Sequence, residues 1–321
     1  MTHPKKKPTE FAINMCCSAL ALIQQEHLTH PSVTELFAEQ PAHIYFVVRR
    51  PRISFVPETF KIDKEFVEID YQIQDKQTFT TKHLKTRNYL STDNAKLICD
   101  FPYTEYKIVD NATDEILAEG FVAALLNAMY FYIDEPSFLD CEVLYIGQAF
   151  GKGGSRTAVD RLQKHSTLQL IYSEAIKKNP DSEIWLCLSS FDQLSFTVMD
   201  GHTKFTDEEL RLDEETYKDT FWKINYEGLN EAQKINFTEA ALIRYFQPPY
   251  NKEYKDSFPT KEHTSYSECY ELDINSVCFE IDTSDKILCN LYSNSIDRTH
   301  LHMTTFLLHS PDERKTFFDL F

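Results

Sequence analysis

The pattern of apolar and polar positions predicts one helix and then a series of strands over the first 120 residues. Apolar positions across residues 9–27 fit an amphipathic helix with Thr9 as its N-cap. From His43 the apolar runs become short, β-branched and aromatic, as in "HIYFVVRRPRISFV" and "EFVEIDYQI", which is typical of strands. Residues 1–120 are therefore expected to form an N-terminal α+β domain rich in strands.

Strands and helices alternate in residues 121–255. The segments "AMYFYI" (128–133), "CEVLYIGQA" (141–149) and "EIWLCLSSF" predict three strands. A helix is expected from Thr157 onward, and a second one in "EAQKINFTEAALIRYF", ended by "QPPYN". This part is therefore expected to form a second domain, with a small three-stranded sheet flanked by helices.

Two further segments complete this division of the chain. An insertion is expected at about 190–230, where the acidic stretch "DEELRLDEETYKD" predicts a solvated helix or a lid. Residues 256–321 return to short strands such as "SVCFEID" and "KILCNLY". The overall fold class is expected to be α+β, with a β-rich C-terminal extension after the second domain.

Composition narrows the class of protein. Of the 321 residues 42% are apolar, which is enough for a sizeable core and excludes a disordered chain. No apolar run reaches the roughly 18 residues needed to span a bilayer, so we expect a cytoplasmic protein without a membrane partner. The eight cysteines include no C-x-x-C pair, which predicts reduced thiols packed in the core rather than a zinc finger.

The formal net charge of −17 argues against a general coat for nucleic acids, because non-specific binding depends on Lys and Arg neutralising phosphates. One segment departs from this acidic character. Between Gly147 and His165 the chain carries four cations and one anion: Lys152, Arg156, Arg161 and Lys164 against Asp160. A basic binding site and an ordinary solvated helix face both fit this local charge.

The same segment holds four of the seven glycines, within "LYIGQAFGKGGSR": Gly147, Gly151, Gly153 and Gly154. A phosphate-binding P-loop would need G-x-x-x-x-G-K-[ST], but here the glycine spacing is one residue short and Lys152 precedes another glycine. The dinucleotide pattern G-x-G-x-x-G is also absent. We expect a sharp turn at Gly147 and a glycine-rich lip beside a site, with a simple long turn as the alternative.

The order of elements over about residues 124–252 resembles the GIY-YIG nuclease family. Tyr145, Ile146 and Gly147 repeat the family's second triplet, and "AMY" stands at the first, so that Tyr130 matches its tyrosine while Ala128 and Met129 depart from it. Further matches lie on the expected helices and after them: Arg161, His165, Glu239 and Asn251. Each of these residues singly also has an ordinary explanation, as a core tyrosine, a solvated helix face, a helix cap or a turn.

The resemblance implies a divalent-metal-dependent endonuclease that hydrolyses phosphodiester bonds. Glu239 would hold one Mg²⁺ or Mn²⁺ ion, Arg161 would contact the scissile phosphate, and Tyr130 or Tyr145 would activate water with His165 as proton acceptor or positioning group. We expect Gly147, Lys152, Arg156 and Asn251 to line the substrate side.

The resemblance also implies a substrate class and partners. DNA is the favoured substrate and RNA stays open, in a restriction, defence or repair role. The N-terminal domain and the insertion are the candidates for target recognition, and a homodimer or a protein partner fits such a role. Two alternatives remain: a nucleic-acid-binding module without turnover, and an acidic regulatory protein that mimics DNA.

Overall fold

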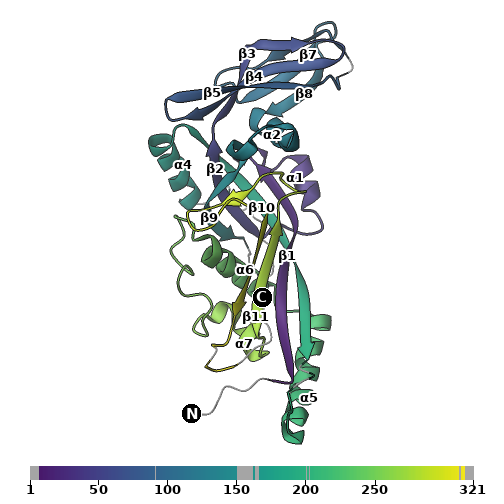
Figure 1. Cartoon of the computed structure of the whole chain (residues 1–321), viewed down its shortest axis with the longest axis vertical. Helices are drawn as coiled ribbons and strands as arrows, with labels where there is room; N and C mark the ends of the chain where they lie inside the picture. Colours follow the sequence, from purple (N-terminus) through teal and green to yellow (C-terminus); the bar gives the residue numbers. More distant parts are fainter. Residues whose placement is uncertain are drawn as a thin grey trace.

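A curled seven-stranded sheet forms the centre of the molecule (Figure 1). The computed structural model describes residues 7–90, 92–149, 162, 166–199, 201, 203–310 and 312–314. The order of strands in the sheet is β12-β9-β2-β10-β1-β11-β13. Their bounds are β1 Thr9–Ile23, β2 Ile44–Pro51, β9 Cys141–Gln148, β10 Ser182–Met199, β11 Ser276–Asp282, β12 Leu291–Tyr292 and β13 Leu301–Leu307.

Two three-stranded antiparallel sheets lie together at one end of the molecule (Figure 1, top). Both come from the chain between β2 and β9, so they form an inserted module. Apolar side chains from the two sheets are buried in one cluster, among them Phe55, Ile69 and Tyr106. The strands are β3 Ile53–Ile62, β4 Phe66–Asp75, β5 Thr78–Arg87, β6 Ala95–Ile98, β7 Glu105–Asp110 and β8 Ile116–Phe121.

The helices cover both faces of the central sheet. Side chains alternate across a strand, so Phe46 and Val48 of β2 pack in the cluster that contains the helix Glu231–Phe246, while Tyr45 and Val47 pack in the cluster that contains the helix Ser166–Lys178. The α-helices are α1 Pro31–Leu36, α2 Val122–Ala128, α4 Ser166–Lys178, α5 Asp207–Trp222, α6 Glu231–Phe246 and α7 Ser267–Glu271. Single turns are η1 Gln25–His27, η2 Tyr130–Tyr132, η3 Pro136–Leu139, the π-turn η5 Lys223–Glu227 and η6 Thr264–Tyr266.

The helix predicted over residues 9–27 is wrong, because this segment is β1. It pairs antiparallel with β10 and parallel with β11, so both edges of the strand are used. Phe11, Ile13 and Met15 are two positions apart and all buried, which is the period of a strand as well as part of the apolar pattern counted for a helix. Thr9 is not a helix cap; its hydroxyl donates to the Asp213 carboxylate at 2.8 Å.

The strand predicted at 128–133 is also wrong: α2 ends at Ala128 and η2 covers Tyr130–Tyr132. The α+β class is confirmed, but the central sheet has seven strands rather than three. The expected boundaries at residues 120 and 255 do not separate sheets. Strands from all three segments pair in one sheet, because β1 and β2 complete the ladder between β9 and β11.

Other predictions are confirmed. The strand β9 and the helix α6 lie where the pattern placed them, and the acidic stretch, predicted as a helix or a lid, is the helix α5. The strand β10 covers the predicted strand but continues to Met199, into the expected insertion. The helix α5 begins with a capping box between Thr206 and Glu209, and it lies at the end opposite the inserted module (Figure 1). All eight cysteines are free thiols. In the part of the chain that the structure describes, no helix combines the length and the apolar character needed to cross a membrane.

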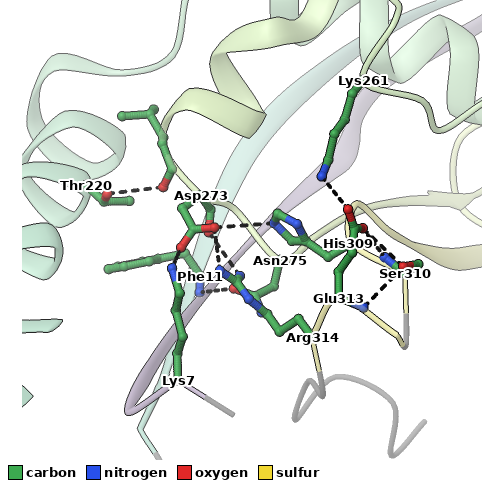
Figure 2. A network of polar contacts seen from close by, with 11 residues as sticks. Lys7, Phe11, Thr220, Lys261, Asp273, Asn275, His309, Ser310, Glu313 and Arg314 are labelled. Carbon is green, nitrogen blue, oxygen red and sulfur yellow. Dashed lines mark hydrogen bonds and ion pairs between the residues drawn. The ribbon is translucent and has the colours of Figure 1, made fainter. Parts of the chain in front are cut away.

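A polar network ties segments from both ends of the chain to the turn before β11 (Figure 2). The Asp273 carboxylate forms ion pairs with Lys7 and Arg314, and His309 Nε2 lies 3.4 Å from it. Arg314 is 8% exposed, so this pairing also compensates its burial. The network therefore holds residues near both termini against the central sheet.

Candidate functional site

The register of β2 against β9 packs two tyrosine rings against one glycine. The two strands are antiparallel, with Tyr45 directly opposite Gly147 and Val47 opposite Tyr145. A Cβ atom on Gly147 would lie 2.5 Å from Tyr45 Oη and 2.8 Å from Tyr145 Cε1, closer than any side chain tolerates. The ring centroids of Tyr45 and Tyr145 are 6.2 Å apart. Gly147 lies inside β9 rather than at the expected sharp turn, and its role is to leave room for both rings.

Tyr45 is a candidate site residue that the sequence pattern did not single out. It ends the triplet His43-Ile44-Tyr45, which contains the isoleucine and the tyrosine of a GIY pattern and has histidine in place of glycine. The signal was present in the sequence, on a strand that was predicted. About 100 residues separate Tyr45 from Tyr145 in the sequence, and "AMY" lies much nearer to Tyr145.

Tyr130 lies away from this cluster. Its hydroxyl accepts a hydrogen bond from Asn290 Nδ2 at 3.2 Å, and the same amide nitrogen donates to Asp140, the residue before β9. Tyr145 is five positions further along, which is about 17 Å at 3.3 Å per residue. Burial raises the pKa of Tyr130, and the Asp140 carboxylate raises it further. The structure therefore does not bring Tyr130 together with Tyr145 as the sequence predicted.

Asn251 holds the loop after α6 against β9. Its Nδ2 donates to Ile146 O at 2.8 Å and its Oδ1 accepts from Ile146 N at 2.9 Å, so the buried amide pairs with the strand as another strand would. The backbone N–H of Tyr250 donates to Leu144 O in the same way. One edge of β9 is paired with β12, but only at Cys141 and Glu142. Asn251 forms hydrogen bonds with the backbone of this edge further along, where β12 does not reach. Both polar groups of this side chain are thus used in positioning the strand.

Glu239 reaches the same end of β9 from α6. This helix begins at an N-cap, Asn230, whose side chain accepts from the N–H of Ala232, and it buries most of its second half. The Glu239 residue is 9% exposed, and its Oε2 accepts a hydrogen bond from Gln148 Nε2 at 2.8 Å. Gln148 follows Gly147 directly, so the carboxylate contacts β9 one residue beyond the glycine that faces the two tyrosines, and it does so from the α6 side of the sheet.

The carboxylate of Glu239 alone is suited to a hard divalent ion such as Mg²⁺. Among the residues that the structure describes, no three His, Cys, Asp or Glu side chains gather as a metal cluster. A hard ion such as Mg²⁺ needs no such cluster, because it keeps several waters and is commonly held by one or two carboxylates together with substrate phosphates. The donor chemistry of Glu239 therefore fits Mg²⁺ or Mn²⁺ with solvent and phosphate oxygens as the other ligands.

A cavity of about 740 Å³ is lined by the start of β2, part of β10 and the first half of α6. Thr238 and Ile235 of α6 line it on one side, and His43 on another. The His43 ring donates from Nδ1 to Ala149 O at 2.9 Å, since a carbonyl oxygen can only accept. The lining residues on α6 end at Thr238, so the cavity is a neighbouring space and Glu239 is not part of its wall.

Several residues named in the sequence analysis lie outside the described residues: Lys152, Arg156, Arg161 and His165, together with Gly151, Gly153 and Gly154. Leu162 is described and is buried with Leu168 and Ile171 of α4, as predicted. These three side chains share a cluster with Tyr45 and Leu144, so this helical segment packs on the face of the sheet that carries Tyr45.

Comparison of the chain with protein-family models, with curated proteins and with solved structures finds no match. Function is therefore inferred from the geometry around Gly147 and from the order of the elements along the chain.

Proposed function

We propose that this chain is a divalent-metal-dependent endonuclease of the GIY-YIG type, which hydrolyses phosphodiester bonds in DNA. The observation that carries the proposal is the register of β2 and β9. It brings a tyrosine from an Ile-Tyr pair and a tyrosine from a Tyr-Ile-Gly triplet together over one glycine. Glu239 and Asn251 then contact the same four-residue stretch of β9.

The order of elements supports the same proposal. From β2 the chain supplies the first tyrosine strand, the second tyrosine strand β9, the helix α4, the strand β10 and the carboxylate helix α6. The resemblance to the family therefore starts at His43, and the inserted module lies between its first two strands. If His43-Ile44-Tyr45 is the first triplet, Ala128 and Met129 are no longer compared with the family pattern. The one difference from the pattern in this triplet is then His43, which stands where the family has glycine.

Each candidate residue has a proposed role in phosphodiester hydrolysis. Tyr45 or Tyr145 takes a proton from the attacking water, which requires a nearby positive charge because the ordinary tyrosine pKa is about 10. In this proposal Arg161 supplies such a charge and binds the scissile phosphate, and His165 receives or relays the proton. A bound Mg²⁺ ion at Glu239 would supply Lewis-acid stabilisation of the leaving oxygen. Gly147 keeps both rings in place, and Asn251 keeps β9 in register with the loop after α6.

The test is cleavage of supercoiled plasmid DNA with Mg²⁺ or Mn²⁺ by the wild type and by Glu239→Ala. We expect the wild type to nick or linearise the plasmid and the variant to lose this activity. If neither protein cuts duplex DNA, single-stranded DNA or RNA although both bind it, the chain is a binding module. Equal cleavage by both would remove Glu239 as the metal ligand.

A further inference from the structure

We infer that Gln148 is a positioning residue that presents the Glu239 carboxylate to its divalent ion through a directional chain of amide hydrogen bonds. This inference rests on the proposed function. It concerns the one amide side chain that links β9 to the candidate metal ligand. Such outer partners orient the metal ligands and thereby tune metal affinity.

The chain of hydrogen bonds runs through three side chains. Gln148 Nε2 donates to Glu239 Oε2 at 2.8 Å and to Asn236 Oδ1 at 2.5 Å. Asn236 Nδ2 in turn donates to the backbone oxygen of Ser265 at 3.1 Å. Asn236 and Glu239 are three positions apart on α6, so both face the end of β9.

The direction of the chain is fixed at its far end. The Ser265 oxygen is a carbonyl that can only accept, so Asn236 must turn its Nδ2 toward it and its Oδ1 toward Gln148. Gln148 must then turn its NH₂ group toward Asn236, and the second hydrogen of that group points at Glu239. A flipped Gln148 would place its single amide oxygen against two other acceptors, Asn236 Oδ1 and Glu239 Oε2, so the hydrogen bonds allow only the orientation in which Nε2 donates.

This arrangement matters more here than in a site with several carboxylates. Among the described residues Glu239 belongs to no cluster of metal-ligating side chains, so the protein's contribution to metal binding depends on how well this carboxylate is oriented. Gln148 and Asn236 extend from a strand end and a helix, which are rigid elements. Loss of an outer partner of this kind typically lowers metal affinity by about 10- to 100-fold.

A direct contact between Gln148 and the nucleic acid is the competing role for this side chain. The two roles differ in what they change. A positioning residue changes the concentration of metal that half-saturates the protein, and saturating metal restores activity. A nucleic-acid contact changes substrate binding at every metal concentration.

The experiment measures Mn²⁺ binding without nucleic acid, by the loss of the free-ion signal in electron paramagnetic resonance. The proteins are the wild type, Glu239→Ala, Gln148→Met, Asn236→Ala and Gln72→Met. Methionine keeps the length of glutamine without its hydrogen bonds, and Gln72 is a matched control in the inserted module, where its amide donates to Thr81. The difference between wild type and Glu239→Ala isolates this site from other carboxylates of an acidic protein.

We expect Gln148→Met to weaken the Glu239-dependent binding by about 10-fold or more, Asn236→Ala to weaken it less, and Gln72→Met to leave it unchanged. In plasmid cleavage, Gln148→Met is expected to need a correspondingly higher Mn²⁺ concentration and to recover at saturation. Wild-type Mn²⁺ affinity in a folded Gln148→Met protein would overturn the inference and leave the proposed function standing. A lower maximal rate at unchanged metal dependence would also overturn it, in favour of a nucleic-acid contact. Equal Mn²⁺ binding by wild type and Glu239→Ala would instead remove the proposed metal site itself.

Discussion

At the scale of single residues, the site is defined by which tyrosine faces Gly147. Tyr45 and Tyr130 are both mostly buried, but only Tyr45 lies over the glycine of β9. Tyr130 is held at the other end of that strand by Asn290, where burial raises its pKa. The two residues therefore form a matched pair for testing the site.

Tyr45→Phe is expected to lower the rate of plasmid cleavage by about 100-fold or more, because a positioned acid–base group contributes roughly 10²–10⁴-fold. Tyr130→Phe removes one hydrogen bond and is expected to stay within about threefold of the wild type. Initial rates of nicking at fixed Mg²⁺ measure both. A larger loss in Tyr130→Phe than in Tyr45→Phe would return the role to Tyr130.

Gly147→Ala is expected to lower both activity and stability. The added methyl group would overlap the Tyr45 hydroxyl and the Tyr145 ring, and overpacking of this kind costs about 1–3 kcal/mol of unfolding free energy. Gly201→Ala is the control, since a Cβ there meets nothing within 4 Å. Urea unfolding and plasmid nicking, measured on both variants, separate the effect of crowding from that of removing a glycine.

At the scale of secondary-structure elements, the comparison of predicted with observed strands and helices shows where the local sequence pattern is enough to predict an element. The strands of the inserted module, β9, β10 and α6 could be predicted, because each has a period or a stop signal of its own. The strand β1 could not, because its Ala- and Leu-rich second half suits a helix and only its long-range pairing with β10 and β11 decides the outcome. Asn251 and Glu239 were named from the resemblance to a nuclease family, whereas Tyr45 became a candidate only through the β2–β9 register.

The hydrogen bonds between Asn251 and the edge of β9 are expected to contribute to stability. Asn251→Ala leaves the buried N–H and C=O of Ile146 without their partners, which is expected to lower the unfolding free energy by about 2 kcal/mol. Asn225→Ala, which removes an exposed amide that donates to the nearby backbone oxygen of Phe221, is the control and should cost less than about 0.5 kcal/mol. Urea midpoints at constant slope measure both variants. Equal stability of the two would show that Asn251 does not hold the strand.

At the scale of the whole molecule, stability depends on buried groups that join separate parts of the chain. His302 of β13 is fully buried, and Tyr245 Oη lies 3.3 Å from its Nδ1. Burial lowers its pKa from 6.5 to about 4, and burial likewise lowers the pKa of His309 to about 4. Both imidazoles are therefore neutral in the folded protein at neutral pH.

The unfolding free energy is expected to be constant above about pH 6.5 and to fall as the pH decreases toward 4. In this window the unfolded chain binds protons that the folded protein excludes, and a shift of this size at His302 corresponds to about 3 kcal/mol. Denaturant unfolding between pH 4 and 8 measures the slope. His302→Gln should show a shallower slope than the wild type; an identical slope would exclude His302 as a source of the pH dependence.

The position of the inserted module has a consequence for how the chain folds. The strands that carry Tyr45 and Tyr145 are neighbours in the sheet, yet about 90 residues separate the end of β2 from the start of β9. Closing a loop of that length costs only about 2 kcal/mol more than closing one of about ten residues, so the equilibrium cost of the insertion is small. The rate responds more strongly than the equilibrium, because long-range antiparallel pairing raises contact order and slows folding. The tyrosine pair should therefore form late, after the module between its strands has closed.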